Sequence, residues 1–463
     1  MGLSAAMEIG KNGLNIYRVA QEVTGENIAN VNTPGYSRQR VLLETAPPVT
    51  ANGFPLGTGV HIASVERYYD GLLQQQLINA QTTQGYDTTK STVLQQVEPT
   101  FNEVAQDGLG AAISDYFGAW QDLTLNPAGS AERQVVLSRA QILTDNFHSV
   151  SKSLNDSISI QNDTLVPLTN DINATLKNIA QLNSQIRTTE LVSGNANEIR
   201  DQRDQLVRDL SLQIGITYTE NSDGTTDIKF ADSGDALVTG SAAGTFSLDK
   251  ITDPNKYAVL LTPAGGTVAA TVAPVTGQLG ATVALRDTII PGYLQQVNDL
   301  ATTITSQVNS QHKLGFDLTG TGGIDFFDAT ATDAATFKIN PFLTSTNQIA
   351  AASNALLTGD NSNALQMAQL QNQKLMTGST STFSSYFDSL VSQVGLDVSS
   401  SKNTEAQDIA FTRQLTTLRG SNSGVSLDEE LTNLIKYQRS YQASAKLITT
   451  ATEMMDTVIN MVR

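Results

Sequence analysis

Few residues of this 463-residue chain could do acid–base, nucleophilic or metal chemistry, and they are scattered. The three histidines, His61, His148 and His312, lie far apart, and none has a partner at a metal-ligand spacing. The chain has no cysteine, which excludes disulfides, thiolate catalysis and zinc–thiolate sites. We therefore expect no catalytic residue, no metal site and no cofactor, and we expect that the protein is not an enzyme.

Three short patterns resemble known chemical motifs, but each lacks its companion residues. Ser149 and Lys152 match the S-x-x-K pattern of some acyl enzymes, but the other motifs of those enzymes are missing. The glycine-rich residues 320–323 lack the Lys-Ser/Thr of a phosphate loop, so they are interpreted as a turn. The carboxylates in residues 221–227 lack the EF-hand spacing, and a weak cation site there stays an open alternative.

Composition restricts the classes of partner. Asp and Glu number 45 against 28 Lys and Arg, giving a net charge of −17 and a sequence pI near 4.5. Because such a surface repels nucleic acid and anionic membranes, we expect neither as a partner. No apolar run approaches the ~20 residues that span a bilayer. The first residues do not form a secretory signal peptide, so export, if it occurs, uses a route without a cleaved signal.

The first candidate element is a helix over residues 3–31. Its apolar side chains recur on three- and four-residue steps, which marks one face of a helix, although Gly10, Gln21 and Thr24 interrupt the stripe. The helix should end before Thr33, and Pro34-Gly35 suits the centre of a type II turn. A strand is expected over residues 37–44. The stripe consists of Leu3, Met7, Leu14, Tyr17, Ile28 and Val31.

The last helix carries the strongest pattern. Ser426 and Glu429 have the spacing of a capping box, and a strict 4-3 repeat follows for five heptads with nine of eleven positions apolar. The helix could pack on its own domain, but a second stripe at the other terminus suggests that the termini pair with each other or with other subunits. The repeat runs through Leu427, Leu431, Leu434, Gln438, Tyr441, Ala445, Ile448, Thr452, Met455, Ile459 and Val462.

The sequence predicts helices in the middle of the chain, interrupted by one β segment. Long helices are expected over residues 86–125 and 130–215, with Pro167 kinking or dividing the second. Arg200, Asp204 and Arg208 sit four residues apart, where opposite charges meet on a helix surface. Residues 215–280 are rich in Gly, Thr, Val and Asp, and short strands are expected at 226–230 and 257–261.

A further helix is expected over residues 281–312, with Pro291-Gly292 near its middle, followed by a Gly/Thr-rich stretch with a short strand near 337–339. From residue 364 the chain should be mostly helical. The fold class is therefore mainly α with an inserted β domain and coiled-coil helices at both termini. We expect three domains: residues 1–60 with 425–463 as a terminal helical assembly domain, 61–214 with 281–424 as a helical body, and 215–280 as the β insert.

Two segments resemble a known family. Residues 27–36 (NIANVNTPGY) resemble the N-terminal motif shared by flagellar rod, hook and hook-associated proteins. Residues 437–446 (YQRSYQASAK), followed by Met454-Met455-Asp456, resemble the C-terminal helix of the same axial family. Four further segments are similar to the hook-associated members: residues 423–430 (SGVSLDEE); 126–127 with 131–134; 201–206 (DQRDQL); and, in order, 285–287, 290–294 and 308–317. Residues 215–280 and parts of 318–360 carry no such match.

The resemblance implies a rod-like structural subunit of the bacterial flagellum. Its paired termini would form an inner layer around a central channel, with a helical-bundle body outside them and a β domain outermost. Copies would form the junction ring between hook and filament, outside the cell, after export through the flagellar type III apparatus. The implied partners are other copies of the chain, the hook protein, a second hook–filament junction protein and an export chaperone that holds the C-terminal helix.

The motif and the two stripes together predict the assembly interface. Its residues are Leu14, Tyr17, Ile28, Asn30, Asn32, Pro34, Gly35, Tyr36, Leu427, Leu431, Leu434, Tyr441, Ala445, Ile448, Met455, Ile459 and Val462. Two alternatives remain open at this point. Another axial subunit, of hook or distal rod, is disfavoured by the long helices expected between 86 and 212, and a secreted adhesin or enzyme would have to use the β insert, which has no His or Cys.

Overall fold

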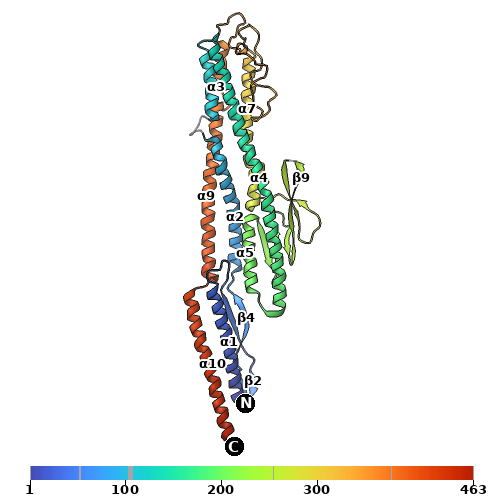
Figure 1. The fold of residues 1–463 in the computed structure, drawn as a ribbon, viewed down its shortest axis with the longest axis vertical. Coiled ribbons are helices and arrows are strands. Elements are labelled where there is room, and N and C mark those ends of the chain that lie inside the picture. The colour runs from blue at the N-terminus through green and yellow to red at the C-terminus, as the bar shows by residue number, and fades with distance from the viewer. Residues whose placement is uncertain (1, 52–53, 103–107, 254, 377, 462–463) are drawn as a thin grey trace.

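The chain folds into a long rod with both termini at one end (Figure 1). The computed structural model describes all residues except 1, 52–53, 103–107, 254, 377 and 462–463. At the terminal end, α1 (Gly2–Ala29) and α10 (Leu427–Met461) lie side by side and extend away from a longer body of helices. The predicted fold class, mainly α with an inserted β domain and paired terminal helices, is confirmed.

A two-stranded ribbon joins α1 to the body. The chain reverses at Thr33–Tyr36, where the Tyr36 N–H donates to the Thr33 carbonyl and Gly35 has a φ of +83°, as a type II turn requires. The ribbon strands β1 (Gln39–Thr45) and β4 (Val60–Arg67) are antiparallel, and a small hairpin of β2 (Val49–Ala51) and β3 (Phe54–Leu56) connects them. The ribbon spans the predicted domain boundary at residue 60, and the division into three domains stays a prediction.

The body is a bundle in which α2 lies between α9 on one side and α5 on the other (Figure 1). Its helices are α2 (Gly71–Val97), α3 (Leu109–Leu123), α4 (Ser130–Ser193), α5 (Asn197–Gln213), α6 (Gly277–Ala284), α7 (Ile290–His312), α8 (Ser362–Gln369) and α9 (Phe383–Ser423). The prediction of one helix over 86–125 is wrong: α2 ends at Val97 and α3 begins at Leu109. At the end of the rod far from the termini, α3 and α7 enclose an aromatic core that includes Trp120, Phe326 and Phe327.

Two prolines lie inside continuous helical runs. Pro167 does not divide α4, which runs for 64 residues, because the flanking Leu165 and Leu168 are both buried in one core and packing outweighs the lost hydrogen bond. Pro291 lies mid-helix as predicted, because α6, a π-helical turn at Leu285–Ile289 and α7 follow one another without a break from 277 to 312, and Pro291 comes directly after the π-helical turn. The wider turn accommodates a residue that lacks an N–H and whose ring would clash with the preceding turn.

The β segment packs against the side of α4. Strands β5 (Ile216–Glu220), β6 (Thr226–Phe230), β7 (Ala236–Thr239) and β8 (Ala242–Ala243) form one antiparallel sheet in that order, and β11 (Ala270–Thr271), β10 (Lys256–Thr262) and β9 (Thr245–Asp253) form a second. The strands predicted at 226–230 and 257–261 are thus confirmed as β6 and β10. Phe230 and Phe246 meet edge to face, with ring centroids 5.6 Å apart, in the core shared with α4.

Helical asparagines fasten the neighbouring non-helical backbone to the rod. Asn183 of α4 donates to the Thr226 carbonyl (2.8 Å) and accepts from the Thr226 N–H (3.0 Å), and Asn173 makes the same pair of bonds with Phe246. On α7, Asn309 does so with Phe327. An amide matches a peptide group in both donor and acceptor, so one neutral side chain satisfies two buried backbone groups. We call these pairs asparagine clamps.

The stretch between α7 and α8 is mostly irregular, and the strand predicted near 337–339 is only an isolated bridge between Phe327 and Ile339. His312 anchors this stretch. Its Nδ1 donates to the Ile324 carbonyl (2.6 Å), and its Nε2 accepts from the Ala350 N–H (2.9 Å), which fixes a neutral tautomer. Burial lowers the pKa of His312 to about 4. This histidine therefore has a structural role.

Candidate assembly site

The terminal helices approach each other closely because small residues line the contact. A Cβ placed on Gly10 would lie 2.6 Å from Cγ1 of Ile448, and one on Gly13 would lie 2.7 Å from the Ser444 hydroxyl. Gly10 therefore lies in the contact, whereas in the sequence it appears to interrupt a stripe. The tyrosine rings of Tyr17 and Tyr437 stack at the same contact, with centroids 6.4 Å apart.

The predicted stripe on α10 coincides only in part with the face that meets α1. That face follows Glu430, Tyr437, Ser444 and Ala451, about one residue around the helix from the prediction. Of the predicted residues, Leu434, Ala445, Ile448 and Met455 are half-buried, Leu427, Leu431, Tyr441 and Ile459 are exposed, and Val462 lies outside the described residues.

On α1, too, the predicted stripe differs from the buried face. The predicted Leu14, Tyr17 and Ile28 are half-buried, whereas the fully buried apolar residues are Ile16, Ala20 and Val23. Small residues set the approach of the two helices: Gly10 and Gly13 on α1 leave room for Ile448 and Ser444 on α10. A pattern of apolar periodicity does not show where such small residues permit close packing.

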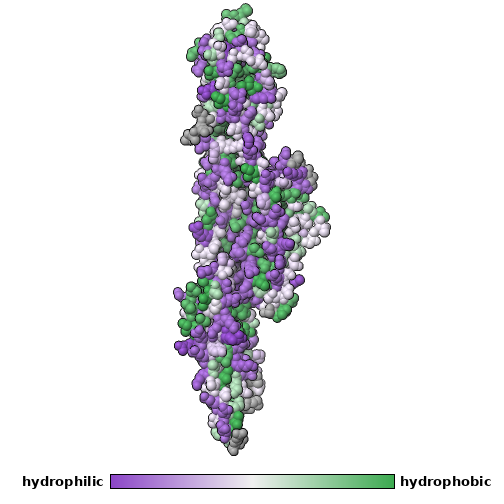
Figure 2. Space-filling view, viewed as in Figure 1, coloured by the Kyte–Doolittle hydropathy of each residue, from purple (hydrophilic) through white to green (hydrophobic). Residues whose placement is uncertain are grey.

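The outer flanks of α10 are consequently apolar and uncovered. Leu427, Leu431 and Ile435 are exposed near its start, Leu431 by 48%, and Leu447, Met454 and Val458 are exposed further along. Figure 2 shows a hydrophobic patch over the beginning of this helix. Between the flanks runs a polar ridge that includes Arg439, Lys446 and Thr450. One helix thus has a face for α1 and apolar surface available to other molecules.

A buried network ties this helix pair to the ribbon. Asn27 clamps Gln39, accepting from its N–H and donating to its carbonyl at 2.9 Å, and its Nδ2 also lies 3.1 Å from the Glu430 carboxylate. Arg38 donates to Glu430 and to Glu429, each at 2.7 Å. The acidic first turn of α10, which the sequence assigns to helix capping, therefore serves mainly to hold the ribbon.

The ribbon is fastened in turn to α5. Arg67, at the end of β4, is buried and pairs with Asp201 (2.8 Å) and Asp204 (2.7 Å), and the Ser37 N–H donates to Asp201 (2.7 Å). Burial raises the pKa of Asp201, while Arg67 and the Ser37 bonds oppose that rise. The prediction that Asp204 pairs on the surface with Arg200 and Arg208 is wrong: Asp204 is buried and pairs with Arg67 and Arg203, and Arg200 pairs with Glu190.

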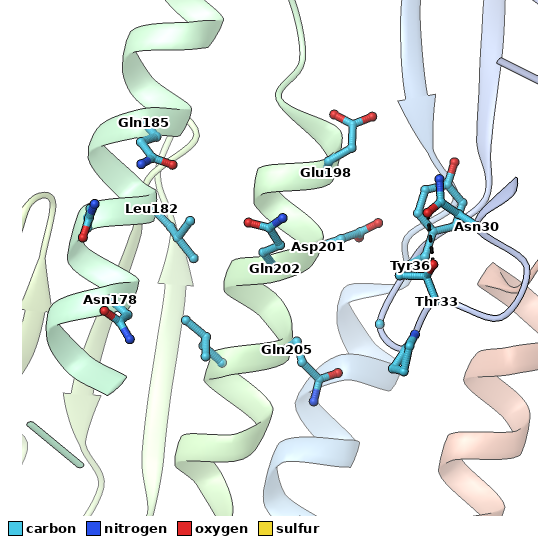
Figure 3. A pocket seen from close by; sticks show the side chains of 14 residues that line it. Asn30, Thr33, Tyr36, Asn178, Leu182, Gln185, Glu198, Asp201, Gln202 and Gln205 are labelled. Atoms are coloured by element: carbon cyan, nitrogen blue, oxygen red, sulfur yellow. Dashed lines mark hydrogen bonds between the residues drawn. The ribbon is translucent and has the colours of Figure 1, made fainter. Parts of the chain in front are cut away.

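The Thr33–Tyr36 turn forms one wall of an open groove (Figure 3). The groove has a volume of about 590 Å³, and α4 and α5 form the other walls. Of the predicted residues, Asn30, Pro34, Gly35 and Tyr36 line it, whereas Asn32 does not and is exposed. The turn is held from behind, because Arg419 of α9 donates to the Gly35 carbonyl at 2.8 Å and Tyr36 donates to Asn27 at 2.9 Å.

The sequence prediction missed the residues that lock this site together, chiefly Asn27, Arg38, Arg67, Asp201 and Glu430. The sequence signals for them were the small residues at positions 10, 13, 20, 444 and 451, and the placement of Asn27, Asp201 and Glu430 in family-like segments. Within the described residues, no group of three or more His, Asp or Glu is arranged to hold a metal ion. Across the same residues, no helix combines the length and apolar character needed to cross a bilayer.

Comparison with known protein families finds three matches along the chain. Residues 94–327 match the model described as "Flagellar hook-associated protein FlgK helical domain". Residues 7–36 match "Flagella basal body rod protein", and residues 420–461 match "Flagellar basal body rod FlgEFG protein C-terminal". The two terminal matches cover α1 from Met7 onward together with the turn, and the whole of α10.

Among curated proteins, the chain is 29% identical to flagellar hook-associated protein 1 of Bacillus subtilis (strain 168), over 98% of this chain and 97% of that one. It is 27% identical to the protein of the same name from Escherichia coli (strain K12), over 99% of this chain and the whole of that protein. Among solved structures, the flagellar hook junction protein FlgK from Burkholderia pseudomallei shares the fold, with a TM-score of 0.65 and 18% identity, covering 75% of this chain and 100% of that chain.

Proposed function

This chain belongs to the flagellar hook-associated protein FlgK family, and we propose that its paired terminal helices build the ring that joins hook to filament in the bacterial flagellum. Its function is mechanical: it presents the same contact surface around an axis, and no catalytic step is involved. A ring of this kind uses heterologous contacts, in which one surface of each copy meets a different surface of the next.

The observation that carries the proposal is the two-sided character of α10. One face packs on α1, while Leu427, Leu431, Ile435 and Ile459 leave an adjoining flank apolar and exposed. An apolar flank on a long terminal helix is stabilised when neighbouring copies cover it, at about 25 cal/mol per Å² of buried apolar surface. The predicted interface residues on this flank and in the turn are therefore the contacts we assign to assembly.

The proposal extends to partners and location. The ring contacts other copies of the chain, the hook protein on one side and a second hook–filament junction protein on the other. It lies outside the cell, after export by the flagellar type III apparatus. Before assembly, an export chaperone holds α10, since the same apolar flank is exposed in the monomer.

Deletion of the gene tests this function. Electron microscopy of the deleted strain should show hooks without filaments, and filament protein should accumulate in the medium. Re-expression of the full chain should restore filaments. Normal filaments in the deleted strain would contradict the proposal, and so would detection of the chain elsewhere in the cell but not at the junction.

A further inference from the structure

The outward face of α9 carries apolar and amide side chains that nothing in the described chain covers. Phe411 is 52% exposed and Leu418 is 53% exposed, one heptad apart, and Leu396 is exposed further up the helix. Gln407 and Gln414 are exposed between them. We call these five residues the α9 stripe. The adjoining side of the same helix segment packs on α2 through Leu415, in a cluster with Leu73 and Leu77.

The groove beside the Thr33–Tyr36 turn has matching chemistry. Its apolar surface comes from Leu182, Leu206, Pro34 and Tyr36. Figure 3 shows the amide side chains of Asn178 and Gln185 on α4 and of Gln202 and Gln205 on α5 around it. Gln181 and the carboxylates of Glu198 and Asp201 also line the groove. Amides both donate and accept, so a second amide-bearing surface can satisfy them without burying charge.

The stripe and the groove lie on different flanks of the rod at the same level. The α2 segment that contacts Leu415 of α9 also meets α5, where Gln74 accepts from Arg208 at 3.0 Å and Gly85 abuts the Leu212 backbone. In Figure 1, α9 and the α4–α5 hairpin stand on the two sides of α2. A closed ring with heterologous contacts requires two different surfaces placed in this way, at one height on separate flanks.

We propose that the α9 stripe of one copy docks into the groove of a neighbouring copy. Phe411 and Leu418 cover the apolar floor at Leu182 and Leu206, while Gln407 and Gln414 exchange hydrogen bonds with the groove amides. The contact packs an uncharged helix face into a groove whose two carboxylates already have partners, since Glu198 accepts from Gln39 at 2.7 Å and Asp201 pairs with Arg67. This inference rests on the proposed ring and names a second lateral contact, made by the α9 face of the body on a groove that includes the Thr33–Tyr36 turn.

Cross-linking in assembled flagella tests this docking contact. Because the native chain has no cysteine, only the introduced cysteines can react. The full chain carrying Gln202→Cys and Gln414→Cys replaces the native protein in cells, and isolated flagella are treated with a short bismaleimide. Both positions are exposed, so the substitutions should not disturb folding. The matched control carries Gln202→Cys and Lys402→Cys, since Lys402 is also exposed but lies on a different side of α9.

We expect a ladder of dimers and higher multimers from the first pair, and loss of that ladder in the control and in each single variant. Leu418→Asp added to the first pair should abolish the ladder while the purified monomer keeps its melting temperature. Filamented flagella that contain the chain but give no ladder would overturn the docking proposal and leave the junction function intact. Absence of the chain from flagella of filamented cells would overturn both proposals.

Discussion

Substitution of Leu431 by Asp should separate assembly from folding more cleanly than substitution of any residue that faces α1. Leu431 is 48% exposed in the described chain, so about half of its side chain is available for burial by a neighbour. Losing that burial costs about 1 kcal/mol per contact, since full burial of a Leu contributes roughly 1.5–3 kcal/mol. Burying the new carboxylate adds several kcal/mol or forces its protonation. Every copy in the ring repeats the penalty, so filaments should be lost.

In the monomer the same substitution should change the free energy of unfolding by less than about 0.5 kcal/mol, as at other surface positions. Two adjacent positions further along α10 serve as controls. Thr450→Asp, on the polar ridge, should leave filaments and monomer unaffected, whereas Ala451→Asp, buried against α1, should unfold the terminal helix pair. The measurements are thermal unfolding by circular dichroism and filament counts by electron microscopy. If Leu431→Asp lowers the monomer's melting temperature as much as Ala451→Asp does, or if its filaments persist, the assignment of this flank to assembly is wrong.

Three further outcomes follow from the buried polar groups. Asn183→Ala should destabilise the fold by about 2 kcal/mol, because it orphans the buried N–H and C=O of Thr226; Asn146→Ala, which removes only a solvent-exposed hydrogen bond on the same helix, should cost far less in urea unfolding. Arg67→Ala should cost about 3–5 kcal/mol at neutral pH because it leaves Asp201 buried without its cation and removes one of the two cations of Asp204, and the deficit should shrink as acid protonates Asp201; a pH-independent deficit would show that charge is not the cause. For His312, whose pKa is about 4 when folded and ordinarily near 6.5, the unfolded chain binds more protons between these values. Stability should therefore be complete above pH ~6.5 and fall by about 3 kcal/mol as pH drops toward 4. Urea titrations should show a shallower pH slope for His312→Gln, and equal slopes would exclude this origin.

Local sequence patterns predicted the secondary structure correctly wherever one short segment determines its own conformation. The Pro34-Gly35 pair specifies a type II turn because proline presets φ and glycine accepts the positive φ of +83°. Strands β6 and β10 were predictable because β-rich runs lie between turn residues. The helical nature of both termini followed from apolar spacing alone. The conformation of the long loop near residue 340 was less predictable. It is fixed by hydrogen bonds from an asparagine clamp and from His312, whose partners are distant in sequence.

Apolar periodicity is enough to predict that α10 is a long amphipathic helix, but the face that meets α1 is selected by packing in the folded chain. The 4-3 repeat defines a band that drifts around a straight helix by ~20° per heptad, so several neighbouring faces fit it. The choice is made by Gly10 and Gly13, whose missing side chains leave room for Ile448 and Ser444. The charges of α5 behave in the same way: Asp204 has local partners four residues away, yet Arg67, distant in sequence, takes it because burial makes that pairing the stronger one.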